Sequence, residues 1–390
     1  MRIAIVYDCL YPHTVGGAER WYRSLAERLA RRHQVTYITR RQWTGATPPT
    51  LPANVHVVAV SRGTPLYTRS GRRRIMPPLR FGAAVLVHLL RHRRSYDVVH
   101  TCAFPYFPLL AAQCAGAHGG PAVVVDWLET WSNQYWRRYL GSVRGRMGAA
   151  VQRLCIRLTD HACVPSKLQA AHLIDGGYQN DPIILKSLYD GPIASFDAQA
   201  SRQPLVVYVG RHIPEKRVEV IPAAIAAARQ RIPALRAAIF GDGPARARVL
   251  AEIERRGLQQ VIRCPGFVPW EEVDATLRSA LCLLLPSERE GYGLVVLEAA
   301  ARGTPSIVVR APDNAATELV DHEENGLVVD SAAPPVLAAA IAAVQAAGAA
   351  LAQRTRVWCA RNTSRLTIDN TISQLEELYS SIIKAAHAPK

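Results

Sequence analysis

The chain has 390 residues, of which 49% are hydrophobic and 20% charged, and this balance predicts two globular domains with proper cores. Its eight cysteines form neither a C-x-x-C pair nor a His/Cys ligand spacing, which argues against structural zinc and favours reduced thiols in the cytosol. We expect no secretory signal. We also expect no membrane-spanning helix, because Gln345 and Gly348 interrupt the most apolar run, 336–351.

The net charge of +16 is concentrated in the first half of the chain. Residues 1–195 carry 25 Lys and Arg against 10 Asp and Glu, whereas residues 196–390 carry 22 against 21. A basic half of this kind is typical of proteins that contact anionic lipid, nucleic acid or an acidic substrate.

The first half alternates short apolar runs with helical patterns. A loop ending in Gly16 and Gly17 follows the first strand, and residues 18–31 have helical periodicity. This alternation predicts an α/β fold with a doubly wound parallel sheet. The strands are expected at 2–7, 34–39, 55–60, 97–100, 121–125 and 162–166.

The second half repeats this pattern after a polar, turn-rich stretch at 196–204, where we place the linker. A long amphipathic helix is expected at 368–383. Two such sheets in tandem predict a ligand bound between them, since open α/β sheets bind at the carboxyl ends of their strands. The strands are expected at 205–209, 237–240, 261–264, 281–285, 306–309 and 326–329.

Residues 286–305, PSEREGYGLVVLEAAARGTP, form the most informative stretch. They follow an apolar run of strand length and continue into a helical pattern, so Glu290 lies in a strand-to-helix turn. The free N–H groups of Gly293, Leu294 and Val295 are suited to hold a phosphate. Glu290 and Glu298 flank this turn and are better suited to accept hydrogen bonds from hydroxyls, because carboxylates repel phosphate. A site for an anion and hydroxyls together indicates a nucleotide sugar; the alternative is a plain strand–turn–helix with two surface acids.

This stretch and several others resemble glycosyltransferase family 4, whose members are retaining enzymes of the GT-B fold. The resemblance is strong in the second half and moderate in the first, where Gly16 and Gly17 resemble the family's glycine loop. The matching segments are 16–20 (GGAER), 210–217 (GRHIPEKR), 241–244 (GDGP), 266–268 (GFV), 290–298 (the E-x7-E motif), 317–319 (TEL) and 325–326 (NG).

The resemblance implies two Rossmann-like domains that face a cleft. The N-terminal domain, 1–195, would bind the acceptor, the C-terminal domain, 196–365, would bind the donor, and the helix at 366–390 would pack back on the first domain. The donor would be a UDP- or GDP-linked sugar, with no other cofactor. Its implied contacts are Glu290 to the sugar, Glu298 to the ribose, Gly293, Leu294 and Val295 to phosphate, Phe267 and Val268 near the base, and Gly16, Gly17 and Gly210 in the turns around the diphosphate.

Arg211 and Lys216 are suited to the charge chemistry of this reaction. A diphosphate leaving group needs cationic stabilisation, and with no metal-ligand cluster visible, fixed cations would supply it. Arginine offers a planar fork and lysine a mobile point charge. The alternative is that both are surface charges after a strand.

The chain departs from the family at 126–131 (DWLETW), where Leu128 stands at the position of a histidine in many relatives. Asp126, Glu129 and His100 remain as polar candidates near the reacting carbon, and each could equally be a helix cap or a satisfied loop residue. In the front-face mechanism implied by the family, the leaving phosphate deprotonates the acceptor. Loss of the histidine would then be tolerated.

The basic half contains two segments rich in arginine. Nine arginines lie between Arg62 and Arg94, and six lie between Trp127 and Arg157 together with five Trp and Tyr residues. This pattern predicts peripheral contact with an anionic membrane and a lipid-linked or glycan acceptor. A single-stranded nucleic-acid surface is less favoured, because it leaves the donor motifs unexplained. A solvated basic face is the third possibility.

The sequence therefore predicts a cytoplasmic, metal-independent retaining hexosyltransferase that associates with membrane at its cytoplasmic face. Its acceptor would be a hydroxyl of a lipid-linked, glycan or small-molecule compound. Two alternatives stay open. One is a sugar-nucleotide epimerase of the same fold, for which we find no clear set of acid and base groups. The other is an inactive protein that binds nucleotide sugar, which Leu128 favours.

Overall fold

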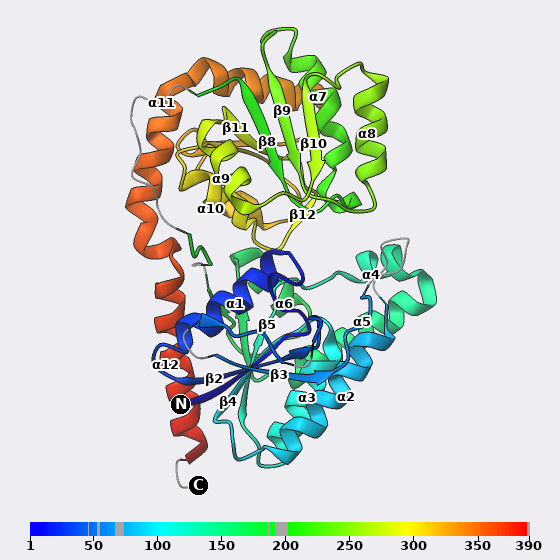
Figure 1. Ribbon diagram of the computed structural model, residues 1–390, viewed down its shortest axis with the longest axis vertical. Helices are drawn as coiled ribbons and strands as arrows, with labels where there is room; N and C mark the ends of the chain where they lie inside the picture. Colours follow the sequence, from blue (N-terminus) through cyan, green and yellow to red (C-terminus); the bar gives the residue numbers. More distant parts are fainter. Residues whose placement is uncertain (46, 53–54, 67–73, 186–187, 192–201, 388–390) are drawn as a thin grey trace. The chain divides into compact units, whose positions relative to one another are not determined.

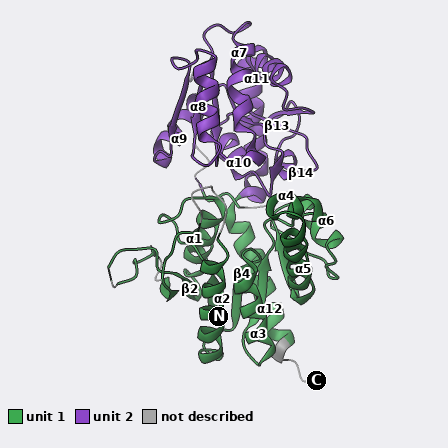
Figure 2. Cartoon of the chain, turned by 90° about the vertical axis from the view of Figure 1, so that its right-hand side faces the viewer, with its two compact units in different colours: residues 1–190, 367–390 green, residues 191–366 purple. Residues whose placement is uncertain are grey.

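The computed structural model describes residues 1–45, 47–52, 55–66, 74–185, 188–191 and 202–387. The chain divides into two compact units (Figure 2): unit 1 comprises Met1–Asp190 and Thr367–Lys390, and unit 2 comprises Gly191–Leu366. Most of the linker predicted at 196–204 lies outside the described residues. Its last part is anchored in unit 2, where the Arg202 guanidinium donates to the carbonyls of Ala280 and Arg302.

Unit 1 contains a parallel sheet with the strand order β3-β2-β1-β4-β5-β6-β7 (Figure 1). Its strands are β1 (Arg2–Val6), β2 (Gln34–Arg40), β3 (His56–Ser61), β4 (Val98–Cys102), β5 (Ala122–Asp126), β6 (His161–Val164) and β7 (Ile183–Ile184). Its helices are α1 (Gly17–Leu29), α2 (Met76–Arg91), α3 (Tyr106–Ala117), α4 (Asn133–Leu140), α5 (Ser142–Leu158), α6 (Lys167–Asp175) and α12 (Ile368–His387).

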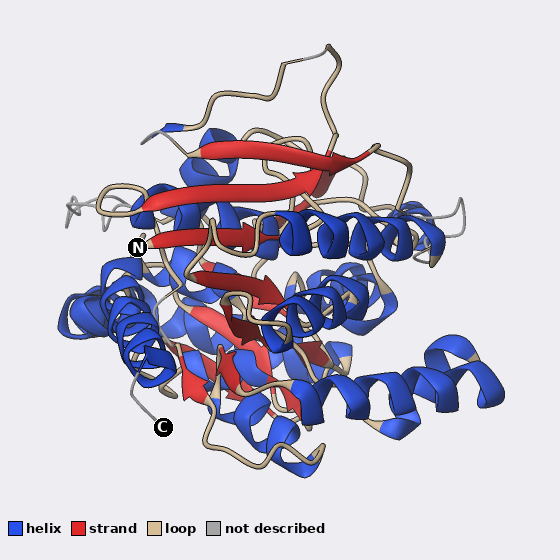
Figure 3. Cartoon of the chain, turned by 90° about the horizontal axis from the view of Figure 1, so that it is seen from below, coloured by secondary structure: helices blue, strands red, loops and turns tan. Residues whose placement is uncertain are grey.

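Helices cover both faces of this sheet (Figure 3). Alternate residues of β1 point to opposite faces, as the period of a strand requires. Ile3 and Ile5 pack in one core with α1 and α12, and Ala4 and Val6 pack in another with α2, α3 and α5. The predicted doubly wound sheet is confirmed, and α12 belongs to this first unit as expected.

Unit 2 contains a second parallel sheet, with the strand order β10-β9-β8-β11-β13-β15, and a separate pair, β12-β14. The strands are β8 (Leu205–Val209), β9 (Arg236–Phe240), β10 (Ile262–Gly266), β11 (Cys282–Leu285), β12 (Arg289–Glu290), β13 (Ser306–Val309), β14 (Asp313–Asn314) and β15 (Gly326–Val329). The helices are α7 (Ile221–Ala228), α8 (Arg246–Arg255), α9 (Trp270–Ser279), α10 (Leu294–Ala300) and α11 (Pro334–Leu366), with short 3-10 turns at Pro214–Lys216, Val218–Val220 and Ala315–Leu319.

Helix α11 contains the alanine-rich run, and its backbone is non-helical at Gly348, where φ is 51° and ψ is −133°. By length and composition alone, this is the one helix among the described residues that could cross a membrane. Leu337, Ile341 and Val344 are nevertheless buried, and the helix packs against α7 and β15. Its apolar side chains therefore serve the core of unit 2.

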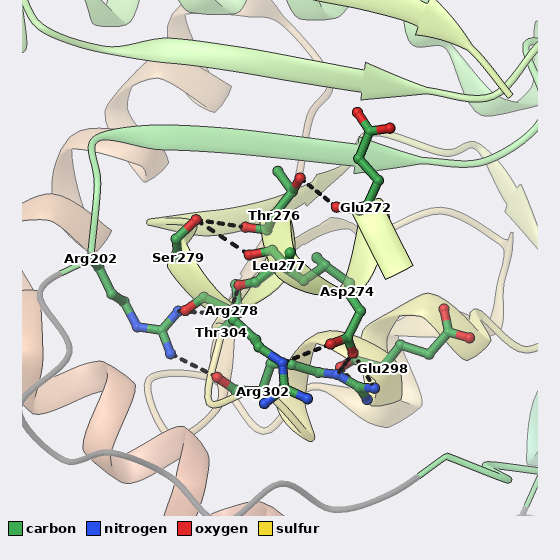
Figure 4. A network of polar contacts seen from close by, with 11 residues as sticks. Arg202, Glu272, Asp274, Thr276, Leu277, Arg278, Ser279, Glu298, Arg302 and Thr304 are labelled. Carbon is green, nitrogen blue, oxygen red and sulfur yellow. Dashed lines mark hydrogen bonds and ion pairs between the residues drawn. The ribbon is translucent and has the colours of Figure 1, made fainter. Parts of the chain in front are cut away.

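A polar network ties α9 to the end of α10 (Figure 4). The Arg302 side chain is 1% exposed, and its Nε donates to Asp274 at 2.6 Å. Arg278 donates to the other oxygen of Asp274 at 2.7 Å. Burial alone would raise the pKa of Asp274, but the hydrogen bonds from Arg278 and Arg302 outweigh it and lower this pKa. The carboxylate is thus charged in the folded protein and compensates a buried guanidinium.

We expect Asp274→Ala to destabilise unit 2 by on the order of 3 kcal/mol, because it leaves the buried Arg302 without its carboxylate. The matched control is Asp330→Ala, because Asp330 pairs with Arg310 on the surface. The Asp330 side chain is 87% exposed and the Arg310 side chain 68% exposed. Urea unfolding measures both variants. Equal losses of stability would contradict a special role for Asp274.

Candidate functional site in unit 2

Three of the motif turns lie next to one another at the carboxyl ends of β8, β9 and β10 (Figure 1). Hydrogen bonds connect their backbones: Gly210 N–H donates to Phe240 at 3.2 Å, and Gly241 N–H donates to Gly266 at 2.9 Å. His212 N–H in the first turn also donates to Asp242 in the second, at 2.8 Å. Segments 210–217, 241–244 and 266–268 therefore form one continuous rim.

Two glycines are required by this close packing. Gly241 has φ of 112°, and a Cβ there would lie 1.9 Å from the Gly210 carbonyl oxygen. Gly293 has φ of 93°, and a Cβ there would lie 2.6 Å from that of Ala316. Both positions combine a left-handed backbone with contact to a neighbouring segment, which only glycine satisfies without strain.

The side chains of Lys216, in segment 210–217, and Glu290, at the start of segment 290–298, contact each other. Lys216 Nζ lies 2.5 Å from Glu290 Oε2 and donates to the Arg289 carbonyl at 3.2 Å. Ser287 Oγ donates to the other carboxylate oxygen at 2.9 Å. The two side chains are 14% and 12% exposed, so the pair is largely withdrawn from water yet still accessible. A cation and a carboxylate from separate motifs are thus placed at one point.

Asn314 holds the Glu290 loop in place, and the sequence reasoning missed it. Strand β12, which contains Glu290, pairs with β14, which contains Asn314. Asn314 Nδ2 donates to the carbonyls of Ser287 at 3.1 Å and Val309 at 2.7 Å. Its Oδ1 accepts from Ala316 N–H at 3.1 Å. The only signal was a turn-forming asparagine between a strand and a helical pattern.

The other predicted donor residues lie around the same edge of the sheet. Gly293, Leu294 and Val295 form the start of α10, and Glu298 lies one turn into that helix with 3% of its surface exposed. Arg211 is exposed, and Tyr208 O–H donates to its carbonyl at 3.1 Å. Burial, followed by the charge of Glu290, raises the pKa of Tyr208 well above its usual range.

The remaining predicted positions divide between the units. Phe267 is 61% exposed after β10, and Val268 is half-buried beside it. In unit 1, Gly16 and Gly17 begin α1; a Cβ on Gly17 would meet nothing within 4 Å. A Cβ on Gly16 would lie 2.2 Å from a Glu19 carboxylate oxygen. The roles of these residues toward a donor stay predictions.

Asp126 and His100 lie in the core of unit 1, where they are 2% and 0% exposed. Asp126 Oδ2 accepts from Trp21 Nε1 at 2.9 Å and from the Tyr22 hydroxyl at 2.8 Å. His100 Nε2 lies 2.8 Å from Asp126 Oδ1, and its Nδ1 lies 2.5 Å from the Tyr379 hydroxyl. Burial and then the Asp126 charge raise the pKa of Tyr22 well above its usual range.

This network gives Asp126 and His100 a structural role beside the one predicted for them near the reacting carbon, which stays a prediction. Their polar atoms are turned to side chains of α1 and α12 rather than to solvent, so the structure favours a role in holding unit 1 together. Leu128 is half-buried and packs against the same core. Glu129 accepts from Trp131 Nε1 at 3.0 Å.

Within the described ranges, no group of three or more His, Cys, Asp or Glu side chains is arranged to hold a metal ion. The chemistry that the site in unit 2 displays is instead a lysine, an arginine, two carboxylates and a helix that begins at a glycine. These groups are suited to bind phosphate and hydroxyls.

Two family models match the chain. The model for a glycosyl transferase 4-like domain matches residues 16–187, and the model for glycosyl transferases group 1 matches residues 194–356. The chain belongs to the family 4 glycosyltransferases. The resemblance drawn from the motifs is therefore confirmed, and the GT-B fold with it.

The protein is similar to several glycosyltransferases of this kind. D-inositol 3-phosphate glycosyltransferase of Salinispora arenicola is 30% identical over 261 residues, which are 59% of this chain and 56% of that protein. Of the first three curated relatives, this chain covers 19%, 36% and 56% of the length.

Two solved structures illustrate the shared fold. Sucrose-phosphate synthase of Thermosynechococcus elongatus has a TM-score of 0.80 and 20% identity, with 98% of this chain and 99% of that chain covered. HepE of Anabaena, in complex with UDP and glucose, has a TM-score of 0.73 and 18% identity, with 98% and 100% covered. At these identities the likeness concerns the fold alone.

We expect Asp126→Ala to lower the thermal unfolding midpoint of this family 4 protein, because the buried donors of Trp21 and Tyr22 lose their acceptor. Each unsatisfied donor should reduce the free energy of unfolding by about 1–3 kcal/mol. Binding of nucleotide sugar should be unchanged, since the motif residues of unit 2 are untouched. Calorimetry and thermal unfolding measure the two quantities. Unchanged stability together with lost turnover would instead assign Asp126 to catalysis.

Proposed function

We propose that this chain transfers a hexose from a UDP- or GDP-sugar to a hydroxyl of a lipid-linked or glycan acceptor, without a metal ion and with retention of anomeric configuration. The observation that carries the proposal is the contact between Lys216 and Glu290 at the carboxyl edge of the unit 2 sheet. The complex of HepE with UDP and glucose supports a nucleotide-sugar donor, because that protein shares the fold.

The residues around this pair suit the separate parts of such a donor. Lys216 and Arg211 would stabilise the diphosphate, together with the N–H groups at the start of α10. Glu290, already held by Ser287, would accept from hydroxyls of the sugar, and Glu298 would accept from the ribose. Phe267 is exposed enough to stack on the base. Lys216 would then share its charge between Glu290 and the phosphate.

The transfer itself breaks the bond from the anomeric carbon to the diphosphate oxygen and forms a bond from that carbon to the acceptor oxygen. In a front-face reaction, both events take place on the same side of the sugar. The acceptor proton passes to the departing phosphate oxygen, so the chain need not supply a base. This is compatible with the burial of Asp126 and His100 and with Leu128 in place of a histidine.

An inactive protein that binds nucleotide sugar is the second candidate, and Leu128 is the observation that favours it. Leu128 packs against the core of unit 1 and offers no polar atom. The two candidates differ in turnover. Donor hydrolysis or transfer supports an enzyme, whereas binding without turnover in any acceptor extract supports the inactive form.

Contact with an anionic membrane at the cytoplasmic face is part of the proposal, and α2 supports it. This helix begins after exposed Ile75, at 63%, and carries exposed Met76, at 54%, and Val87, at 46%. Arg80 and Arg91 lie on the same helix. Exposed apolar side chains interleaved with arginine suit a helix in the plane of a membrane surface. Arg69, Arg72 and Arg73 of the predicted basic segment lie outside the described residues.

Lys216→Ala and Glu290→Ala should each lower kcat for sugar transfer by on the order of 10²–10³-fold, because each removes one preorganised contact to the donor. Arg217→Ala and Glu288→Ala are matched controls, since these residues form a more exposed pair, 3.1 Å apart, in the same two loops. Initial rates with radiolabelled UDP- and GDP-hexoses provide the measurement. Equal losses in all four variants would attribute the effect to loop structure and remove the assignment.

The anomeric configuration of the product should match that of the donor. Proton NMR of the first turnovers reads it directly from the coupling constant of the anomeric proton. An inverted product would eliminate the front-face mechanism and would require a base from the chain.

A further inference from the structure

Helices α4 and α5 of unit 1 form an open pocket that the proposed transfer does not use. Its volume is about 160 Å³, and its lining residues are Asn133, Arg137, Arg146, Ala149 and Arg153. Three of these five residues are arginines and none is a carboxylate. Within the described part of the chain, the three guanidinium groups take part in no ion pair or side-chain hydrogen bond.

Two glycines bring the arginines together. A Cβ on Gly145 would lie 2.6 Å from the Trp136 carbonyl oxygen and 2.7 Å from the Cα of Arg137. A Cβ on Gly148 would lie 2.5 Å from the Trp136 ring. The backbone of α5 therefore approaches the α4 backbone closely at Gly145, directly before Arg146, and the Trp136 ring at Gly148. Arg137 of one helix and Arg146 of the other line the same pocket.

Gln152 fixes the arrangement from the buried side. Its Oε1 accepts from Trp136 Nε1 at 3.1 Å and from Trp131 N–H at 3.1 Å, and its Nε2 donates to the Trp131 carbonyl at 2.8 Å. Gln152 is 4% exposed and lies directly before Arg153. The three arginines are exposed, and the helices that carry them are held together by these hydrogen bonds.

Three positive charges around one pocket without a carboxylate repel one another, so an anion that enters the pocket relieves this repulsion. The planar guanidinium fork matches the oxygens of phosphate, and Asn133 can add a neutral donor. We infer that the α4–α5 pocket binds the phosphate group of a phosphate ester. Phosphate binding here does not depend on sugar transfer, because none of the lining residues belongs to the proposed donor site, whereas binding of a headgroup would rest on the proposed membrane contact.

Two sources of phosphate fit: a soluble phosphorylated compound, or the headgroup of a phospholipid. The adjoining surface of α5 favours the headgroup. Val143, Met147 and Leu154 are 61%, 64% and 49% exposed, and their spacing of four and seven residues places them on one face. Arg146 and Arg153 are adjacent to this face along the helix. Apolar side chains beside arginines suit the boundary between headgroups and acyl chains.

Arginine labelling with phenylglyoxal, mapped by peptide mass spectrometry on the full chain, tests the pocket. At a phosphate concentration of about twice the Kd, occupancy should slow labelling of Arg146 and Arg153 about threefold relative to chloride of equal ionic strength. Arg144 and Arg157 lie outside the pocket on the same helix and serve as internal controls. Two further arms use vesicles of phosphatidylcholine alone and of phosphatidylcholine with phosphatidylglycerol.

Selective protection by inorganic phosphate supports the pocket and indicates a soluble ester. Selective protection only by vesicles with phosphatidylglycerol supports the pocket and indicates a headgroup. No protection in any arm, or equal slowing at Arg144 and Arg157, overturns the inference. The double variant R146Q/R153Q should lose the protection at Arg137, while R144Q/R157Q, with the same loss of charge, should keep it. Neither variant alters the donor residues, so nucleotide-sugar binding reports on the proposed function separately.

Discussion

The contact between Lys216 and Glu290 is the interaction on which the site depends. The two residues belong to motifs far apart in the sequence: Lys216 ends the short 3-10 turn Pro214–Lys216, and Glu290 lies in β12. Partial burial of the pair strengthens its attraction relative to one in bulk water. The loops are also joined by a backbone hydrogen bond from Glu288 N–H to the Glu215 carbonyl, at 2.9 Å. A short charged contact and a backbone hydrogen bond together join two turns at the edge of the sheet into one continuous surface.

Many of the strands and glycine turns could be predicted, because they depend on local sequence patterns. Runs such as Leu205–Val209 are apolar and of strand length, and glycine turns such as that at Gly293 need a backbone that other residues rarely adopt. The two-residue strands β7, β12 and β14 could not be predicted in this way. A period of two cannot be recognised in two residues, and their pairing depends on which loops the fold brings together. Asn314 escaped notice for the same reason.

The structure shows partners of Asp126 and His100 that the sequence did not reveal. From the sequence, each is a polar residue at or near the end of a predicted strand, where ligands usually bind. Their partners Trp21, Tyr22 and Tyr379 come from helices before and after them, and no local pattern reveals that these side chains converge. The partners of Asp126 and His100 lie on α1 and α12, so the burial of these two residues can be recognised only once the position of α12 is known.

Helix α12 completes unit 1, but in the sequence the whole of unit 2 lies between α12 and the rest of unit 1. Leu375 and Tyr379 are fully buried, and they belong to the same core as Ile3 and Ile5 of the first strand. During synthesis, unit 2 emerges complete while that core still lacks one side. The core of unit 1 can therefore be completed only after unit 2 has been synthesised, and until then its apolar surface beside α1 is open to aggregation.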